Sequence, residues 1–212
     1  MIGYRTIDRQ AKVEMVIKKS RFIGSAFPIR TAEAANEILA TFRKQMWDAN
    51  HHCYAYVLGE RGDQKKFFDD GEPQGTAGMP ILDVIDKKGL TYVLVVVTRY
   101  FGGVLLGTGG LVRAYAGTCA GALDAAGIRV LLQSGCVQLR CDYALWGKVE
   151  RELHQQDVQI AQTEFLADVC CTVWARAEHV QPFIAHMVDV CGGRIDVKLV
   201  EEGLFEWPES PL

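Results

Sequence analysis

The spacing of apolar and polar positions in the first 133 residues changes repeatedly between a strand-like and a helix-like period. Period-two alternation, or a continuous run of β-branched residues, predicts strands. Apolar positions three and four apart predict helices, with Thr31 as an N-cap and Gly89 as a C-terminal stop. The predicted strands are 11–17, 20–29, 52–58, 65–68, 90–100 and 128–132. The predicted helices are 32–47, 76–86 and 109–126, and Pro80 marks the first turn of the second one.

The residues after 135 follow a second, shorter pattern. In order it predicts a strand at 136–141, a helix at 143–155, strands at 158–164 and 167–175, a helix at 177–190 and a strand at 193–200. This β-α-β-β-α-β order is typical of a ferredoxin-like fold. The tail from Glu201 is expected to fray. The sequence therefore predicts an α+β protein with domains at 1–133 and 136–203, joined at Gln133-Ser134-Gly135.

The charge distribution supports the same division. The 212 residues carry a net charge of −3 and are 49% hydrophobic, which is ordinary for a globular protein. Residues 1–133 hold 17 Lys and Arg against 13 Asp and Glu, whereas residues 134–212 hold 6 against 13. The two halves therefore differ in surface charge, and the first half is favoured if nucleic acid binds.

Cysteine usage and hydropathy indicate the compartment. The seven cysteines are scattered without a Cys-x-x-Cys pair, which favours a reduced, cytoplasmic protein. No apolar segment follows a basic start, so we expect no signal peptide. The apolar runs are far shorter than the ~20 residues that cross a bilayer, so no membrane association is expected.

The segment Val97–Tyr115 is the first candidate for a site. Five glycines fall within nine residues, where a strand ends and a helix begins. The unpaired N–H groups of a helix start attract anions, and arginines bind phosphate in a bidentate manner. The alternative is that the glycines serve turns and packing while the arginines pair with nearby carboxylates. The candidate anion- or nucleic-acid-binding residues are Arg99, Gly102, Gly103, Gly107, Thr108, Gly109, Gly110 and Arg113.

The basic turn Lys18-Lys19-Ser20-Arg21 adds Lys19 and Arg21 to these candidates. The alternative for this turn is a solvated hairpin tip.

The acidic segment Asp69–Gly78 precedes a predicted helix. Its carboxylates either cap that helix and complement its dipole, which we favour, or hold Mg²⁺ or act as acid or base. Gly75 and Thr76 supply a tight turn into the helix. The candidates for a polar groove are His51, Asp69, Asp70, Glu72, Gly75 and Thr76.

The strand that starts at His51-His52-Cys53 offers ligand types that suit zinc. Consecutive strand residues point to opposite faces, so at most alternate side chains converge, and a polar strand start with a buried Cys53 is favoured. His51 alone is a candidate for proton transfer or substrate contact, because histidine titrates near neutrality. No nucleophile and base have a recognisable spacing, so no catalytic residue, metal or cofactor is assigned.

Four blocks of the chain resemble the IMPACT family, in its YigZ-type branch. They are Lys19-Ser20-Arg21-Phe22-Ile23, residues 51–56, residues 69–78 and residues 98–115, and the resemblance covers roughly 15–125. The resemblance implies an N-terminal domain similar to domain IV of elongation factor G and to ribosomal proteins, a sheet with helices on one face. It also implies a C-terminal domain similar to the last domain of elongation factor G. Both likenesses point to translation and RNA.

The eukaryotic members of this family carry an extra N-terminal module that competes for an activator of a translation-initiation kinase. This chain begins almost at the shared domain, so we expect no such kinase-regulating partner.

Three functions remain open. The leading one is a cytoplasmic, non-catalytic, regulatory protein that binds RNA or the ribosome, and a translation-related protein is a further expected partner. The second is an enzyme on a phosphorylated small molecule, with Mg²⁺ at Asp69, Asp70 or Glu72 and assistance from His51. The third is a protein-interaction regulator. Any site should lie where Gly107–Gly110 faces the acidic segment and His51, with Arg99 reaching into it.

Overall fold

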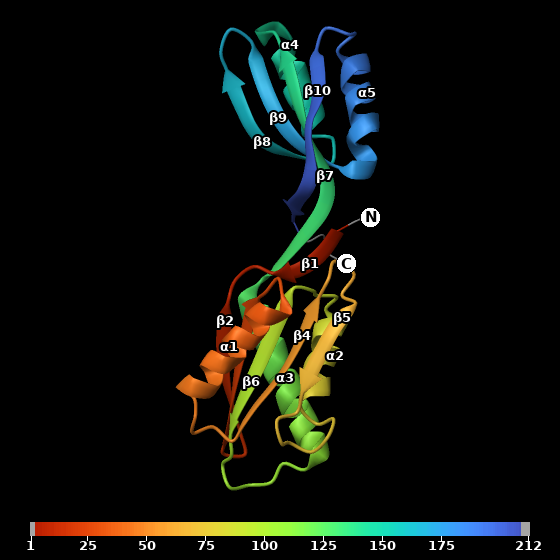
Figure 1. Ribbon diagram of the computed structural model, residues 1–212. Helices are drawn as coiled ribbons and strands as arrows, with labels where there is room; N and C mark the ends of the chain where they lie inside the picture. The colour runs from red at the N-terminus through yellow and green to blue at the C-terminus, as the bar shows by residue number, and fades with distance from the viewer. Residues whose placement is uncertain (1–2, 209–212) are drawn as a thin grey trace. The chain divides into compact units, whose positions relative to one another are not determined.

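A computed structural model describes residues 3–208 of the chain (Figure 1). These residues form two compact units, one at 4–130 and the other at 131–208 together with Gly3. Among the described residues, no helix combines the length and the apolar content that a bilayer crossing requires.

The first unit is built on an antiparallel sheet of five strands. In spatial order the strands are β2 (Ala11–Ile17), β3 (Ser20–Pro28), β6 (Val93–Tyr100), β4 (His51–Leu58) and β5 (Gln64–Phe68). The helices of this unit are α1 (Ala32–Gln45), α2 (Gly78–Lys87) and α3 (Thr108–Ala126). These elements match the predicted ones to within a few residues, and the Thr31 hydroxyl accepts the Ala34 N–H as the expected N-cap of α1.

Helices cover both faces of this sheet, so the expectation of helices on one face is wrong (Figure 1). The alternation along β4 shows the reason. Cys53, Ala55 and Val57 pack with residues of α2 and α3, whereas Tyr54 and Tyr56 pack with residues of α1. Successive strand side chains point to opposite faces, and both sets here are apolar, so each face needs a covering layer.

The second unit has the predicted β-α-β-β-α-β order. Its elements are β7 (Ile128–Cys141), α4 (Tyr143–Leu153), β8 (Val158–Phe165), β9 (Val169–Arg176), the short 3-10 helix η1 (Ala177–His179), α5 (Val180–Val190) and β10 (Asp196–Trp207). The spatial order of the strands is β10-β7-β9-β8. The strand β1 (Gly3–Ile7) was not predicted, and its residues from Tyr4 onward belong to the first unit. The ferredoxin-like assignment itself stays a prediction.

Two expectations about the second unit are wrong. The predicted strands 128–132 and 136–141 form one continuous strand, β7, because Ser134 and Gly135 fit inside it. The Ser134 hydroxyl bonds the Leu132 carbonyl and the indole N–H of Trp207, and a side chain at Gly135 would collide with Val180. From Glu201 to Trp207 the chain does not fray, since β10 runs on to Trp207, whose side chain is buried, and residues 209–212 lie outside the described residues.

Candidate functional site

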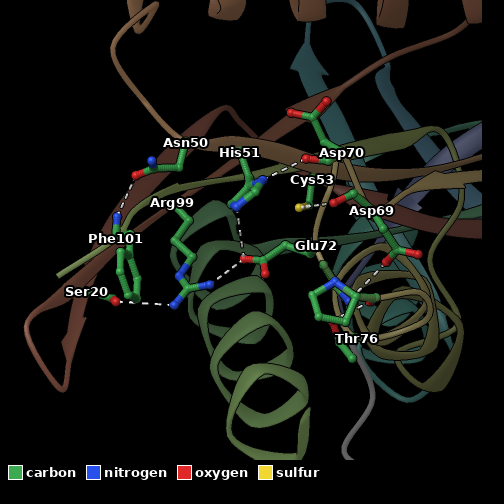
Figure 2. A network of polar contacts seen from close by, with 12 residues as sticks. Ser20, Asn50, His51, Cys53, Asp69, Asp70, Glu72, Thr76, Arg99 and Phe101 are labelled. Carbon is green, nitrogen blue, oxygen red and sulfur yellow. Dashed lines mark hydrogen bonds and ion pairs between the residues drawn. The ribbon is translucent and has the colours of Figure 1, made fainter. Parts of the chain in front are cut away.

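A cavity of about 420 Å³ lies at one end of the first sheet. Its walls come from the turn before β4, the acidic segment, the end of β6 and the start of α3 (Figure 2). This is the place where the sequence predicted a site, because these four segments carry its polar motifs. The lining residues are Asn50, His51, Glu72, Pro73, Arg99, Phe101, Leu105, Leu106, Gly107, Thr108 and Leu111.

The carboxylate of Glu72 is the buried centre of the site. Its Oε1 accepts a hydrogen bond of 2.7 Å from Nη1 of Arg99 and another of 2.7 Å from the hydroxyl of Tyr115. Burial raises the pKa of Tyr115, so this hydroxyl keeps its proton and donates it. Two donors therefore fix the position of the Glu72 carboxylate at the cavity wall.

Arg99 is buried beside Glu72 and is fixed on several sides. Its guanidinium lies over the rings of Phe22 and Phe101, at 5.3 and 5.4 Å from their centroids. Nη2 lies 3.4 Å from the hydroxyl of Ser20. Because its charge is paired inside the protein, Arg99 reaches the cavity as part of an ion pair and not as a free phosphate clamp.

His51 faces Glu72 from the start of β4 (Figure 2). Its Nδ1 lies 2.7 Å from the carbonyl oxygen of Asp70, and since a carbonyl only accepts, Nδ1 carries the proton. In the neutral ring Nε2 is then an acceptor, and it lies 3.9 Å from Oε1 of Glu72. His51 is thus oriented by the backbone of the acidic segment, with Nε2 toward Glu72.

The carboxylates of Asp69 and Asp70 bind backbone N–H groups. Asp69 accepts from the N–H groups of Gly75, Ala77 and Gly78 and so caps the start of α2, which is the favoured interpretation from sequence. Asp70 accepts the backbone N–H of His52 at 2.6 Å. Within residues 3–208, no three His, Cys, Asp or Glu side chains are placed to hold a metal ion. The loop therefore gives no support to a magnesium site.

His52 and Cys53 point into the protein. Nε2 of His52 bonds the carbonyl of Met46 and Nδ1 bonds the hydroxyl of Thr98. Burial lowers the pKa of His52. The thiol of Cys53 donates to the carbonyl of Asp69, and burial raises its pKa. Neither side chain joins His51, so the zinc interpretation fails and the favoured interpretation holds.

The other predicted site residues are spread around the cavity. Gly107 begins α3 with a φ of +73°, and Thr108 follows it at the wall. Gly102 packs against the backbone of Lys19, where any Cβ would collide, and so serves close approach. Gly103 has a φ of +79° and serves the turn, while Gly75 also has a positive φ. Gly109 lies in α3.

The remaining basic candidates lie outside this cavity. Arg113, Lys18 and Gly110 line a smaller cavity of about 170 Å³, to which Leu106 also contributes. Arg21 forms a bidentate pair with Glu14 across the β2–β3 hairpin, so it does not face the candidate site. Lys18 and Lys19 form the tip of that hairpin with positive φ.

Sequence reasoning did not single out the apolar half of the site or two of its polar members. Tyr115 lies two turns along α3 from Thr108 and donates to Glu72. Asn50 accepts the backbone N–H of Phe101 and so joins the ends of β4 and β6. The position of Asn50 directly before a predicted strand was a signal for such a link, whereas nothing in the sequence marked Tyr115.

The cavity is formed by the same blocks that define a protein family. Residues 18–123 match the Impact N-terminal domain and residues 139–194 match a domain of unknown function, DUF1949. The chain belongs to the IMPACT family. The IMPACT family member YvyE of Bacillus subtilis is 36% identical over 92% of this chain and 90% of its own length. The IMPACT family member YigZ of Escherichia coli is 38% identical over 88% and 92%.

The similarity extends to structure. A crystal structure of a hypothetical protein is 34% identical to this chain and covers 95% of it and 98% of its own chain, with a TM-score of 0.59.

The rabbit Protein IMPACT is 31% identical over 45% of this chain and 31% of its own length.

Proposed function

We propose that this chain is a cytoplasmic, translation-associated RNA-binding protein with a regulatory role, and that its first unit holds one unstacked nucleotide of a single-stranded RNA in the cavity. The observation that carries the proposal is that the N-terminus of α3 lies at the wall of a cavity whose other walls are largely apolar. Gly107 and Thr108 line the cavity, and no side chain caps α3. Unpaired N–H groups at a helix start favour a phosphate.

The apolar walls supply the second half of a nucleotide site. Phe101 and Leu105 line the cavity and are 45% and 82% exposed. Single-stranded nucleic acids bind by placing bases against aromatic and apolar side chains. A volume of about 420 Å³ lies in the range of small-ligand pockets and is far below the size of a duplex groove, so one base is the appropriate occupant.

The neighbouring cavity supplies cations for the RNA backbone. Leu106 lines both cavities, and Lys18 and Arg113 line the second one. An RNA strand with one base in the first cavity would carry its next phosphates toward these two side chains. Such contacts depend on salt, because each neutralised phosphate releases counterions.

The test is the binding of a fluorescent nine-nucleotide single-stranded RNA at several salt concentrations. The double variant Lys18→Gln, Arg113→Gln should bind more weakly. Its binding constant should also depend less steeply on salt concentration, by the amount expected for the loss of about two phosphate contacts. The matched control is Lys44→Gln, Lys87→Gln, which removes two lysines on α1 and α2. No salt-sensitive association of the unaltered chain at low ionic strength would contradict the proposal.

The approach of His51 to Glu72 supports a second candidate function, an enzyme on a phosphorylated small molecule. An oriented imidazole and a buried carboxylate face one apolar cavity at a helix start, which suits proton transfer next to a bound phosphate. Mass spectrometry of nucleoside monophosphates and sugar phosphates incubated with the protein should then show consumption that His51→Gln abolishes. If neither the parent nor the variant consumes any of these compounds, the enzyme function is wrong and RNA binding remains the proposed function.

A further inference from the structure

Nε2 of His51 and the carboxylate of Glu72 lie close together at the wall of the cavity. Nδ1 of His51 donates to the carbonyl of Asp70, so in the singly protonated ring Nε2 is an acceptor. Oε1 of Glu72 lies 3.9 Å away, too far for a direct hydrogen bond. Oε1 of Glu72 already accepts from Arg99 and Tyr115, but an ionised carboxylate has further lone pairs, so this group can accept one more hydrogen bond. A ligand group that donates to Nε2 of His51 can therefore donate to the carboxylate of Glu72 as well.

The charges beside these two groups select a neutral donor. Arg99 already balances the carboxylate of Glu72 through an ion pair of 2.7 Å. A ligand ammonium would add a second cation beside this guanidinium and close to the positive start of α3. A neutral planar amino group has two N–H bonds that diverge at about 120°, so it can donate one to Nε2 and one to the carboxylate of Glu72. A hydroxyl has a single proton and satisfies only one of them.

We propose that the cavity recognises a nucleobase through an exocyclic amino group that donates to both His51 and Glu72. This inference rests on the proposed function, in which one base of an RNA occupies the cavity. It predicts a preference for adenine over hypoxanthine and for cytosine over uracil. In each pair the disfavoured base places a carbonyl oxygen against two acceptors, which is repulsive and leaves Nε2 of His51 without a donor from the ligand.

The walls of the cavity fit a planar base. Leu111 and Pro73 line it beside the polar pair, and the ring of Phe101 stands at its wall. A base with its amino edge toward Glu72 keeps its two apolar faces against such side chains. Its sugar and phosphate then remain toward Gly107 and the start of α3.

The direct test uses nine-nucleotide RNAs that differ at the central base alone, at pH 8. A central adenine in oligouridine should bind about tenfold or more tightly than a central hypoxanthine, which is the discrimination expected of one good bidentate contact. A central cytosine should exceed uracil in the same way. Equal affinities, or a preference for hypoxanthine, would overturn the inference.

Substitution of His51 tests whether the preference for adenine arises from the contact with His51 and Glu72. His51→Phe keeps a planar ring and removes the acceptor, so the affinities for the adenine and hypoxanthine RNAs should become similar. The matched control His154→Phe alters an exposed histidine of the second unit and should keep the preference. A preference that survives His51→Phe would contradict the assignment. A cooperative urea transition like that of the parent shows that the variant is folded.

Free nucleotides separate this inference from the RNA-binding function. If all oligonucleotides bind alike with salt dependence, the RNA-binding function stands and the amino-group inference is wrong. If no oligonucleotide binds but adenosine monophosphate binds more tightly than inosine monophosphate, the inference stands for a mononucleotide and the RNA-binding function is wrong. If nothing binds, both are wrong.

Discussion

Glu72 and Arg99 form an ion pair of 2.7 Å, and their side chains are 3% and 6% exposed. The two residues come from different segments, the acidic segment and the end of β6, so the pair ties the loop that caps α2 to the central sheet. Removing one partner of a buried pair leaves an uncompensated charge. The site is therefore expected to be a stability element and a binding element at the same time.

The ion pair predicts strong non-additivity. Arg99→Met should lower the free energy of unfolding by about 3–5 kcal/mol, because Glu72 then stays buried with Tyr115 as its remaining close donor. The double variant Arg99→Met, Glu72→Gln removes both charges and should recover much of this loss. Urea denaturation of the single and double variants measures the loss of unfolding free energy and its recovery. Additive losses would show that the two side chains act independently.

The Asp69 carboxylate predicts a second stability effect. Asp69→Ala removes the acceptor of three backbone N–H groups at the start of α2, and should cost about 1–2 kcal/mol of unfolding free energy. Asp83→Ala alters an exposed carboxylate in the middle of α2 and serves as the control. The comparison uses urea denaturation at one pH. Equal effects of the two substitutions would mean that the cap contributes nothing of its own.

His52 predicts a pH dependence with a definite sign. Burial lowers the pKa of His52, although the nearby Asp70 carboxylate opposes the shift. As the pH falls below about 6.5, the unfolded chain takes up this proton before the folded one, so stability should decrease. The stabilisation contributed by the neutral His52 ring is fully present above that pH. It is lost as the pH falls toward the lower pKa of His52 in the folded protein.

The measurement is the free energy of unfolding between pH 5 and pH 8. His52→Gln should flatten the decrease, whereas His154→Gln, at an exposed position, should leave the slope unchanged. Identical slopes for the parent and His52→Gln would show that another group controls this range.

Trp207 predicts that the last strand is part of the second core. Its side chain is 2% exposed and its indole N–H donates to the Ser134 hydroxyl. Trp207→Ala should cost about 3–5 kcal/mol in the second unit, whereas Val200→Ala, at an exposed position, should cost much less. Urea unfolding followed by the fluorescence of Trp146 and Trp174 measures this. A small effect of Trp207→Ala would restore the expectation of a frayed tail.

The sequence predicted the elements of the first unit well because its strands and helices have strong periodicity and clear stops. The β2–β3 turn at Lys18 and Lys19 and the Thr31 cap are local features, and both are present. The helices on both faces were not predicted, because the apolar Tyr54–Tyr56 side of β4 was not read as a face that needs its own layer.

The position of the candidate site could be predicted from the sequence, but the contacts among its side chains could not. The glycine segment, the acidic segment and His51 were expected to meet, and the cavity lies between them. Which carboxylate faces the cavity is decided by tertiary geometry, since Asp69 and Asp70 turn to backbone N–H groups while Glu72 meets Arg99. Tyr115 donates to Glu72 from a helix 43 residues later, a distance over which no local pattern extends.

Binding of RNA in the cavity can be followed by a methyl NMR titration of the whole chain with a short RNA that contains one adenine. The methyl signals of Leu105, Leu106 and Leu111 should shift together, because these residues line the cavity. The signals of Leu145 and Leu153, in the core of the second unit, should not move. Shifts confined to the second unit, or no shifts at RNA concentrations that saturate binding, would contradict the account.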